Sequence, residues 1–358
     1  MKIYVFGTRG FPNIQGGVEK HCEELYTSMP SAYDITVFRR KPFINSDKIY
    51  KNIHFIDLST VKIKGIEALL HSFLCVLYCI GKRPDIIHVH NIGPGLFIPL
   101  LKMVGLKVVL TYHSPNYEHN KWSYLAKKGL KICEFIATKG ADKIIFVNKF
   151  QLQKFSPTIQ AKSYYIPNGI KEKTEIKDSS FIRSLGLSPF QYILAVGRIT
   201  PEKGFDYLIK AYNLMHNKSV KLVIAGGCDH SSTYAKQLIQ EACKSQVILA
   251  GYMNEEQLNN LYTYARLFIL PSFNEGYPIV LVEAINYQKP ILASNIEANK
   301  FIGLAKDQYF EVGSVNELKD KIEYELNKEY KNITYNISIP TWKEIANLVT
   351  KIYSTLIH

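Results

Sequence analysis

The sequence predicts an α/β protein with two parallel sheets, each covered by helices on both faces. The chain has 358 residues, enough for about two domains. Short apolar runs such as KIYVFG at 2–7 alternate with segments of helical periodicity, as buried parallel strands and their crossover helices do. The alternation stops at a polar stretch over 171–189 and begins again with YILAVG at 192–197. Two Rossmann-like domains that face a central cleft are the simplest architecture that fits.

In the first half, apolar runs predict the strands and a 3.6-residue period predicts the helices between them. We expect strands at 2–7, 35–38, 53–58, 85–90, 108–112, 143–147 and 164–166. Helices are expected at 18–29, 66–80 and 121–141. The Pro-Asn-Gly sequence at 167–169 is a turn signal that ends this domain, which we place at 1–170.

The second half repeats the pattern after the linker predicted at 171–189. Strands are expected at 192–197, 221–225, 247–250, 267–270 and 291–293. Helices are expected at 205–215, 234–245, 254–265 and 278–287, with Pro278 at the first position of the last one. The second domain therefore extends over 190–340, and a C-terminal helix follows at 341–358.

Composition excludes several classes of protein. Hydrophobic residues make up 47% and charged residues 21%, as in ordinary globular domains, so a disordered chain is excluded. The six cysteines form no C-x2-C pair, which favours neither a zinc site nor a disulfide framework and fits a reduced, cytoplasmic setting. The apolar segment 66–80 is shorter than the roughly 20 residues of a membrane span, so we interpret it as a buried or interfacial helix.

The positive charge is concentrated in the first half of the chain. Residues 1–170 contain 23 Lys and Arg against 11 Asp and Glu, whereas residues 171–358 contain 21 against 20. Such asymmetry suggests that the first domain faces an anionic partner, which can be a lipid surface, a nucleic acid or a phosphorylated substrate. Scattered lysines that only keep the domain soluble are the alternative.

The first candidate binding motif is GRITPEKG at 197–204. It follows a predicted strand and opens a helix, and Gly197 lets the backbone approach a ligand closely. Arg198 and Lys203 bring two positive charges to the same loop, which suits a diphosphate. A βα turn with two solvated cations is the alternative.

The second motif is PSFNEGYP at 271–278, which continues to Glu283. The start of a helix near Pro278 favours an anion, and Glu275 precedes it in the loop. Glu283 lies about a turn and a half into the helix. Carboxylate oxygens accept hydrogen bonds from hydroxyl groups, so the two glutamates suit a polyol. Compensation of the helix dipole by Glu275 and a surface position for Glu283 are the alternatives.

These motifs resemble those of the retaining glycosyltransferases of family 4. The resemblance is carried by EGYPIVLVE, the preceding GRITPEKG and the following PILAS. The N-terminal segment MKIYVFGTRGFPNIQGGVEKHCEEL is also similar to the rhamnosyltransferase-like subgroup, which builds cell-surface polysaccharide. The resemblance implies the GT-B fold, in which the C-terminal helix crosses back to the N-terminal domain.

The resemblance also implies roles for individual residues. Arg198 and Lys203 would hold the donor diphosphate and stabilise the leaving group, while Glu275 would contact the donor sugar and Glu283 the ribose. Backbone groups would also contact the donor phosphates. His113, after the fifth strand, lies where many members of the family have an active-site histidine. The backbone positions are Gly16, Gly17, Gly197, Gly226, Gly276 and Tyr277.

No metal or other cofactor is expected, because the chain contains no Asp-x-Asp motif and the two cations replace the ion at the diphosphate. His88 and His90 alternate on a predicted strand and therefore share one face. They either edge the acceptor site or pack as ordinary strand histidines.

The expected activity is transfer of a sugar, rhamnose or a hexose, from a nucleotide-diphosphate donor to a polyprenyl-diphosphate-linked or other glycan acceptor. The basic first domain would bind an anionic membrane, with the protein peripheral on the inner face of the plasma membrane. Candidate contacts are the segment 66–80 and Arg39, Arg40, Lys41, Lys62, Lys64, Lys82, Arg83, Lys127 and Lys128. A sugar-nucleotide epimerase and a basic nucleic-acid-binding protein are the alternatives, although the dispersed lysines argue against nucleic acid.

Overall fold

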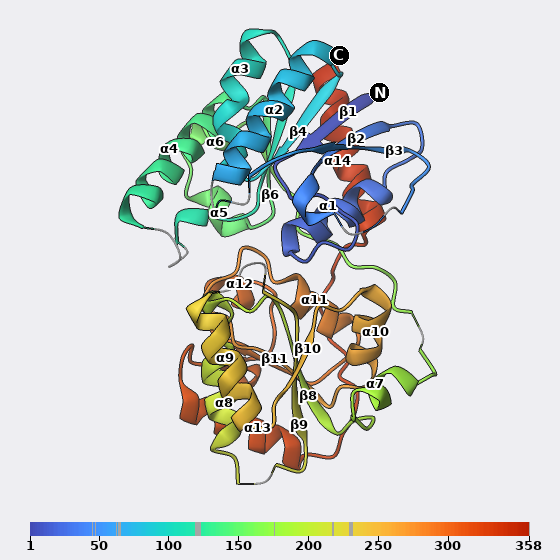
Figure 1. Cartoon of the computed structure of the whole chain (residues 1–358), viewed down its shortest axis with the longest axis vertical. Coiled ribbons are helices and arrows are strands. Elements are labelled where there is room, and N and C mark those ends of the chain that lie inside the picture. The colour runs from blue at the N-terminus through green and yellow to red at the C-terminus, as the bar shows by residue number, and fades with distance from the viewer. Residues whose placement is uncertain are drawn as a thin grey trace. The chain divides into compact units, whose positions relative to one another are not determined.

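The computed structural model describes residues 1–44, 46, 48–61, 63, 66–118, 123–174, 176–216, 218–228 and 232–357. The chain divides into two compact units (Figure 1). Unit 1 comprises Met1–Gly169 together with the C-terminal segment from Pro340 onward, and unit 2 comprises Ile170–Ile339. The C-terminal helix therefore belongs to the same unit as the N-terminus.

Unit 1 is built on a seven-stranded parallel sheet of order β3-β2-β1-β4-β5-β6-β7. Its strands are β1 (Lys2–Phe6), β2 (Asp34–Arg40), β3 (Ile53–Leu58), β4 (Ile86–His90), β5 (Val108–Tyr112), β6 (Lys143–Phe146) and β7 (Ser163–Tyr165). Its helical elements are α1 (Gly17–Thr27), η1 (Lys41–Phe43), α2 (Ile66–Lys82), η2 (Pro94–Phe97), α3 (Ile98–Met103), η3 (Asn116–Glu118), α4 (Tyr124–Gly140), α5 (Lys149–Gln153), α6 (Pro157–Gln160) and α14 (Trp342–Ile357).

The two faces of this sheet are covered by different helices. Helices α1 and α14 bury one core with Leu25, Tyr26 and Tyr353, all inaccessible to solvent. Helices α2, α3 and α4 bury the other core through side chains such as Val76 and Leu101. Since strands buried on both faces have no solvent side, the near-continuous apolar runs of the sequence are explained.

Unit 2 is built on a six-stranded parallel sheet of order β10-β9-β8-β11-β12-β13. Its strands are β8 (Tyr192–Val196), β9 (Lys221–Ala225), β10 (Ile248–Gly251), β11 (Leu267–Leu270), β12 (Ile291–Ser294) and β13 (Tyr309–Phe310). Its helical elements are α7 (Ser180–Ser184), η4 (Pro201–Lys203), α8 (Phe205–Asn213), α9 (Thr233–Lys244), α10 (Glu255–Tyr264), α11 (Ile279–Asn286), α12 (Glu297–Lys300), η5 (Lys306–Gln308) and α13 (Val315–Asn327).

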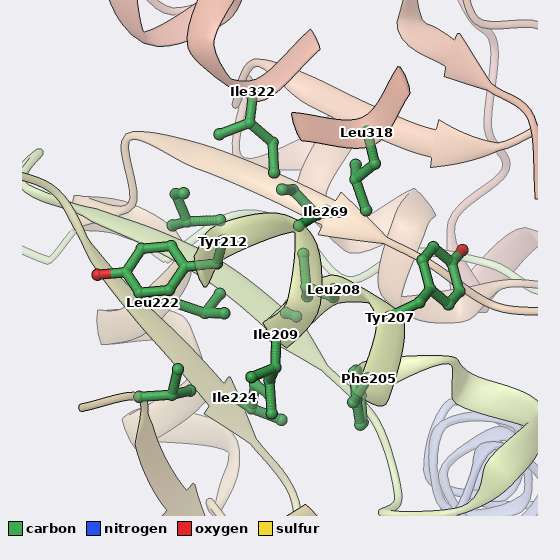
Figure 2. Close-up of a cluster of buried hydrophobic side chains, with 14 of the residues drawn as sticks. Phe205, Tyr207, Leu208, Ile209, Tyr212, Leu222, Ile224, Ile269, Leu318 and Ile322 are labelled. Atoms are coloured by element: carbon green, nitrogen blue, oxygen red, sulfur yellow. The ribbon is translucent and has the colours of Figure 1, made fainter. Parts of the chain in front are cut away.

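Helix α8 carries much of the core on one face of this sheet (Figure 2). Leu208 and Ile209 are fully buried and lie among side chains from β9, β11 and α13. The opposite face is covered by α10 and α11, whose Leu261 and Leu281 are equally inaccessible. This packing fixes the strand ends from which the candidate motifs extend.

The segment 171–189, expected as a linker, is included in unit 2. Its second half contains α7, and Ile182 and Leu187 are buried in the core of that unit. Apolar side chains in an otherwise polar segment thus dock it onto the domain. The helix expected from residue 121 begins at Tyr124 after the Ser123 N-cap, and residues 121 and 122 lie outside the described residues.

Two of the expected surface cations are buried instead. Arg39 donates from Nε to Oδ1 of Asp57 at 2.7 Å, and Arg40 pairs with Glu67 at 3.4 Å. The reason is that β2 lies inside the sheet, where each guanidinium needs a carboxylate partner. Lys62 and Lys64 lie outside the described residues.

All six cysteines are free thiols in the structure. Among the described residues, none of the helices combines the length and the apolar character that crossing a bilayer requires.

Candidate functional site

In unit 2, three loops leave neighbouring strands at the carboxyl edge of the sheet. They follow β8 at Gly197, β9 at Gly226 and β11 at Pro271, and these strands lie side by side in the order β9-β8-β11. In open parallel sheets this edge is where ligands bind. The topology therefore brings together the two motifs that the sequence singles out.

The loops after β8 and β11 are held together by backbone contacts. Phe273 donates its N–H to the carbonyl of Glu202 at 2.8 Å. Gly204 adopts φ 66°, and a Cβ there would overlap the carbonyl oxygen of Pro271. The Tyr207 hydroxyl donates to that same carbonyl at 2.5 Å. A glycine is thus required at 204, both by the left-handed conformation and by the close approach of the loops.

Lys203 and Glu275, which are 72 positions apart, form an ion pair across these two loops. Lys203 Nζ donates to Glu275 Oε1 at 2.5 Å, and the side chains are only 18% and 10% exposed. The Ser272 hydroxyl donates to the same oxygen at 2.6 Å. An ammonium group has three N–H donors, so one lysine can serve this carboxylate and an anion together. The aliphatic chain of Lys203 lies against Gly197, which leaves little room for a side chain there.

Glu283 is oriented by a different partner, on the second turn of α11. The Tyr262 hydroxyl of α10 donates to Glu283 Oε2 at 3.0 Å and also to the carbonyl of Val280 at 3.2 Å. Burial, followed by the neighbouring Glu283 charge, raises the pKa of Tyr262 well above its usual value. The tyrosine therefore remains a neutral donor that holds the carboxylate. No pattern in the sequence pointed to Tyr262 as this partner.

The remaining predicted residues of unit 2 lie in the same loops. Arg198 is half-buried directly after Gly197. Gly226 donates its N–H to the carbonyl of Gly251 at 2.7 Å, so it joins the ends of β9 and β10. Gly276 and Tyr277 lie between β11 and α11, and Tyr277 packs against the core. Helix α11 begins at Ile279, one residue later than expected, with Pro278 as its N-cap.

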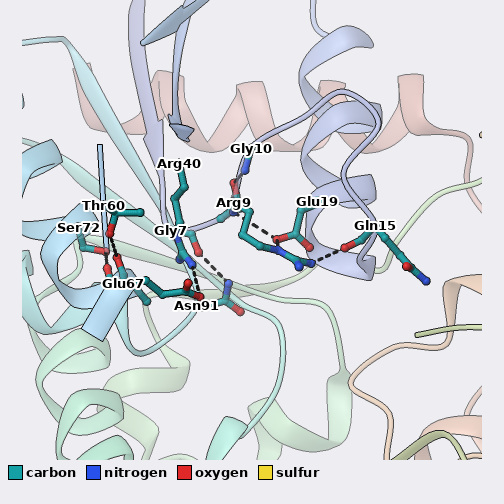
Figure 3. A network of polar contacts seen from close by, with 12 residues as sticks. Gly7, Arg9, Gly10, Gln15, Glu19, Arg40, Thr60, Glu67, Ser72 and Asn91 are labelled. Carbon is teal, nitrogen blue, oxygen red and sulfur yellow. Dashed lines mark hydrogen bonds and ion pairs between the residues drawn. The ribbon is translucent and has the colours of Figure 1, made fainter. Parts of the chain in front are cut away.

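In unit 1, the glycine-rich loop at Gly16 and Gly17 leads into α1 and is braced by a buried ion pair (Figure 3). Arg9 Nε donates to Glu19 Oε1 at 3.1 Å, and the Arg9 guanidinium also donates to the carbonyl of Gln15. Gly16 has φ 152°, and a Cβ there would overlap the Glu19 carboxylate. Sequence reasoning missed Arg9 and Glu19, because a charge in a loop or in the first turn of a helix gives no sign of burial.

His113 follows β5 and belongs to a buried cluster of histidines. Its Nε2 lies 3.0 Å from His90 Nδ1, and His90 Nε2 lies 2.7 Å from the Tyr26 hydroxyl. His88 is held by three hydroxyl groups, those of Tyr26 at 2.9 Å, Tyr353 at 2.6 Å and Thr111 at 2.7 Å. Of the two interpretations of His88 and His90, packing within the strand is therefore correct, since both are inaccessible to solvent.

A fourth histidine, His21 on α1, completes the cluster. Its Nδ1 lies 2.6 Å from Asn168 Oδ1, and its ring stands edge-on to His113 with centroids 4.7 Å apart. Burial lowers the pKa of His21 to about 4, and burial together with neighbouring histidines lowers those of His90 and His113 well below the usual value. The rings are thus neutral at pH 7. No local pattern pointed to His21, because its partners are distant in the chain.

Comparison with known proteins assigns the chain to a family. The profile of "Glycosyltransferase Family 4" matches residues 15–173, and that of "Glycosyl transferases group 1" matches residues 180–338. The chain belongs to glycosyltransferase family 4. This assignment sets aside the sugar-nucleotide epimerase.

Relatives of this family 4 glycosyltransferase include an uncharacterized glycosyltransferase of Methanocaldococcus jannaschii, 26% identical, with 83% of this chain and 81% of the relative covered. The alpha-galactosylglucosyldiacylglycerol synthase of Streptococcus pneumoniae is 30% identical, but the match covers 49% of this chain and 50% of that protein.

Solved structures confirm the expected GT-B fold. Sucrose-phosphate synthase from Thermosynechococcus elongatus superposes with a TM-score of 0.84 at 18% identity, covering 99% of this chain and 98% of that one. HepE of Anabaena, solved with UDP-glucose, superposes with a TM-score of 0.75 at 16% identity, covering 99% and 97% of the two chains. At these identities the likeness establishes the fold.

Proposed function

We propose that this glycosyltransferase transfers a sugar from a nucleotide-diphosphate donor with retention of configuration and without a metal ion at the diphosphate. The observation that carries the proposal is the ion pair of Lys203 and Glu275 at the edge of the unit 2 sheet. It joins a cation suited to phosphate with a carboxylate suited to sugar hydroxyls, and it fixes both on rigid loops. The structure of HepE with UDP-glucose supports a donor of this class.

Breaking the bond between sugar and diphosphate develops negative charge on the leaving phosphate oxygen. Lys203, held in place by Glu275, and Arg198 in the same loop would stabilise that charge as it forms. The start of α11 would add a favourable dipole. These groups are positioned before the reaction, so they stabilise the charge without reorganising. This preorganisation is the main source of such stabilisation.

The two carboxylates would recognise hydroxyl groups of the donor. Glu275, in the loop beside Lys203, would accept from the sugar, and Glu283, oriented by Tyr262, would accept from the ribose. His113, Gly16 and Gly17 in unit 1 would contact the donor as well. We name no protein nucleophile for the retaining step. The sugar proposed is rhamnose or a hexose.

A donor screen with the purified protein tests this proposal. Nucleotide release and thermal shift would be followed with dTDP-rhamnose and with UDP- and GDP-hexoses, with and without EDTA, and with a polyprenyl-diphosphate-linked sugar as acceptor. One donor should stabilise the protein and turn over equally in EDTA. Turnover abolished by EDTA and restored by Mg²⁺ would contradict the metal-independent mechanism. A product of inverted anomeric configuration would contradict retention.

We further propose that unit 1 docks on an anionic membrane, where a lipid-linked acceptor resides. The supporting observation is the orientation of α2, which exposes its apolar side. Glu67, His71 and Ser72 are buried together with Cys75, Val76 and Cys79. Lys82 is exposed at the end of the helix. The exposed side chains between residues 66 and 77 are all apolar, at 37–52% accessibility: Ile66, Leu69, Leu70, Phe73 and Leu77. An exposed apolar stripe of this kind marks an interaction surface.

Helix α4 continues this surface with mixed apolar and basic character. Both α2 and α4 contact η2 on the same face of the sheet. Ile132 and Phe135 of α4 are exposed, and so are Lys128 and Lys131. Apolar side chains that enter the interface, with lysines beside them, are what an anionic bilayer surface binds.

Vesicle co-sedimentation with phosphatidylglycerol tests the docking surface. Phe73→Ser and Leu77→Ser should each lower the partition coefficient about 5- to 30-fold, because each removes roughly 1–2 kcal/mol of apolar transfer. The matched control is Leu214→Ser, which removes an equally exposed leucine from unit 2. If a variant that combines Phe73→Ser and Leu77→Ser bound the vesicles as tightly as the wild type, the docking surface would be wrongly assigned.

A further inference from the structure

Three histidines from separate elements of unit 1 converge on one buried point. His21 comes from α1, His90 ends β4 and His113 follows β5. One ring nitrogen of each lies within 4.8 Å of the ring nitrogens of the other two, and all three side chains are buried. Such convergence of imidazoles is the arrangement that a transition metal ion requires.

Two of the three rings are oriented by a hydrogen-bond partner on the ring nitrogen that faces away from the other histidines. Asn168 Oδ1 lies 2.6 Å from His21 Nδ1, so that nitrogen carries the proton and Nε2 presents a lone pair. The Tyr26 hydroxyl contacts His90 Nε2, while His90 Nδ1 lies 3.0 Å from His113 Nε2 in a hydrogen bond whose proton a metal ion would replace. Metal-binding histidines characteristically have such partners, which fix the tautomer and the ring orientation.

A second observation points to a ligand at this place. His21 Nε2 is buried and has no hydrogen-bond partner among the described residues. An unsatisfied buried acceptor costs about 1–3 kcal/mol, so folding would not leave one without compensation. His88, in the same cluster, shows the contrast, because both of its nitrogens are satisfied by hydroxyl groups.

We propose that His21, His90 and His113 bind a divalent transition metal ion of the Zn²⁺ type. Three neutral imidazoles suit Zn²⁺ rather than Mg²⁺ or Ca²⁺, which prefer oxygen ligands. A water molecule would complete a tetrahedral site.

The ion would link α1, β4 and the loop after β5, and it would fix the orientation of His113. The three ligands are the buried side chains of His21, His90 and His113, whereas the expected metal-free mechanism concerns an ion on the donor diphosphate beside Arg198 and Lys203. The inference does not rest on the proposed function. A failed donor screen would leave the metal content unchanged, and an empty site would leave transferase activity possible.

Metal analysis of the full-length protein tests the inference. After expression with added Zn²⁺ and gel filtration, the wild type should carry about one Zn²⁺ per chain, as a buried three-histidine site would. The His21→Ala and His113→Ala variants should lose it. The matched control is His54→Ala, which removes a histidine whose side chain is 67% exposed and should keep the ion.

A second measurement avoids mutation. Protein freed of metal with a strong chelator would be titrated with Co²⁺ and then Zn²⁺. Visible d–d absorption of tetrahedral strength with Co²⁺, and a rise of several degrees in Tm with Zn²⁺, would support the site. Wild-type protein that holds less than a tenth of an equivalent and gives no Co²⁺ spectrum would overturn the inference. So would a folded His21→Ala variant that keeps the wild-type stoichiometry.

Discussion

The ion pair of Lys203 and Glu275 makes a prediction that can be worked through quantitatively. The 2.5 Å contact joins two side chains that are at most 18% exposed. A hydrogen bond to a charged group contributes about 1.5–3 kcal/mol in net terms. Glu275→Gln removes the charge and keeps the size, so it should lower the free energy of unfolding of unit 2 by about that amount. For a unit of 170 residues (170–339), a loss of 2 kcal/mol corresponds to about 4–8 °C in Tm.

A double-mutant cycle isolates the pair from its surroundings. Lys203→Met and Glu275→Gln would each be measured alone and together by urea unfolding followed by far-UV circular dichroism. The loss in the double variant should be smaller than the sum of the single losses by about 1.5–3 kcal/mol. Both tryptophans of the chain lie outside 170–339, so tryptophan fluorescence reports unit 1 and serves as an internal control. A coupling below about 0.5 kcal/mol would refute the reasoning, because independent sites add to within that error.

The same variants separate stability from activity. Lys203→Met should lower kcat about 10²- to 10³-fold, the usual cost of removing one group that stabilises charge in the transition state. The assay temperature would be set about 15 °C lower than the Tm of the variant, so that the protein stays folded. Full kcat in folded Lys203→Met would show that this lysine is not at the leaving group.

Three further predictions concern other parts of unit 2. Glu283→Ala should raise KM for the donor at least tenfold, and an unchanged KM would refute ribose recognition. The Tm should change by less than about 3 °C, because the hydroxyl group of Tyr262 can turn to the Val280 carbonyl. Gly204→Ala should lower unfolding free energy by at least 2 kcal/mol from backbone strain and overlap with Pro271, as urea titration would reveal. Burial lowers the pKa of Lys289 to about 7, so the unfolded chain binds one more proton than the folded protein between pH 7 and 10.5. The free energy of unfolding should therefore rise with pH in this range, by up to about 1.4 kcal/mol per pH unit relative to the Lys289→Met variant. Parallel pH profiles of the two proteins would contradict this.

Local patterns predicted most of the sheet. The strands expected at 53–58, 108–112, 221–225 and 267–270 have the same bounds in the structure. Buried parallel strands are short, apolar and bounded by turn residues, so their sequence signal is complete within a few positions. The two-residue strand β13 and the polar helix α13 were missed, because their place depends on neighbours in the sheet and not on their own pattern.

In the candidate site, the sequence predicted the loops that carry the charged residues but not the contacts between them. The loops that carry Arg198, Lys203 and Glu275 were found because each follows a strand, and strand ends gather at one edge. That Lys203 and Glu275 form one ion pair could not be predicted, since the pairing depends on the order of strands in the sheet. The Tyr262 partner of Glu283 also depends on how α10 packs against α11.

The sequence by itself determined the fold class, the doubly wound alternation and the loops that carry the binding motifs, because hydrophobic periodicity and turn residues act over short distances. The tertiary structure decided which charges are buried, as with Arg39 and Arg40, and which side of α2 remains exposed. It also brought His21, His90 and His113 to one point from three elements. Contacts between residues far apart in the chain follow from strand order and helix packing, and no local pattern records them.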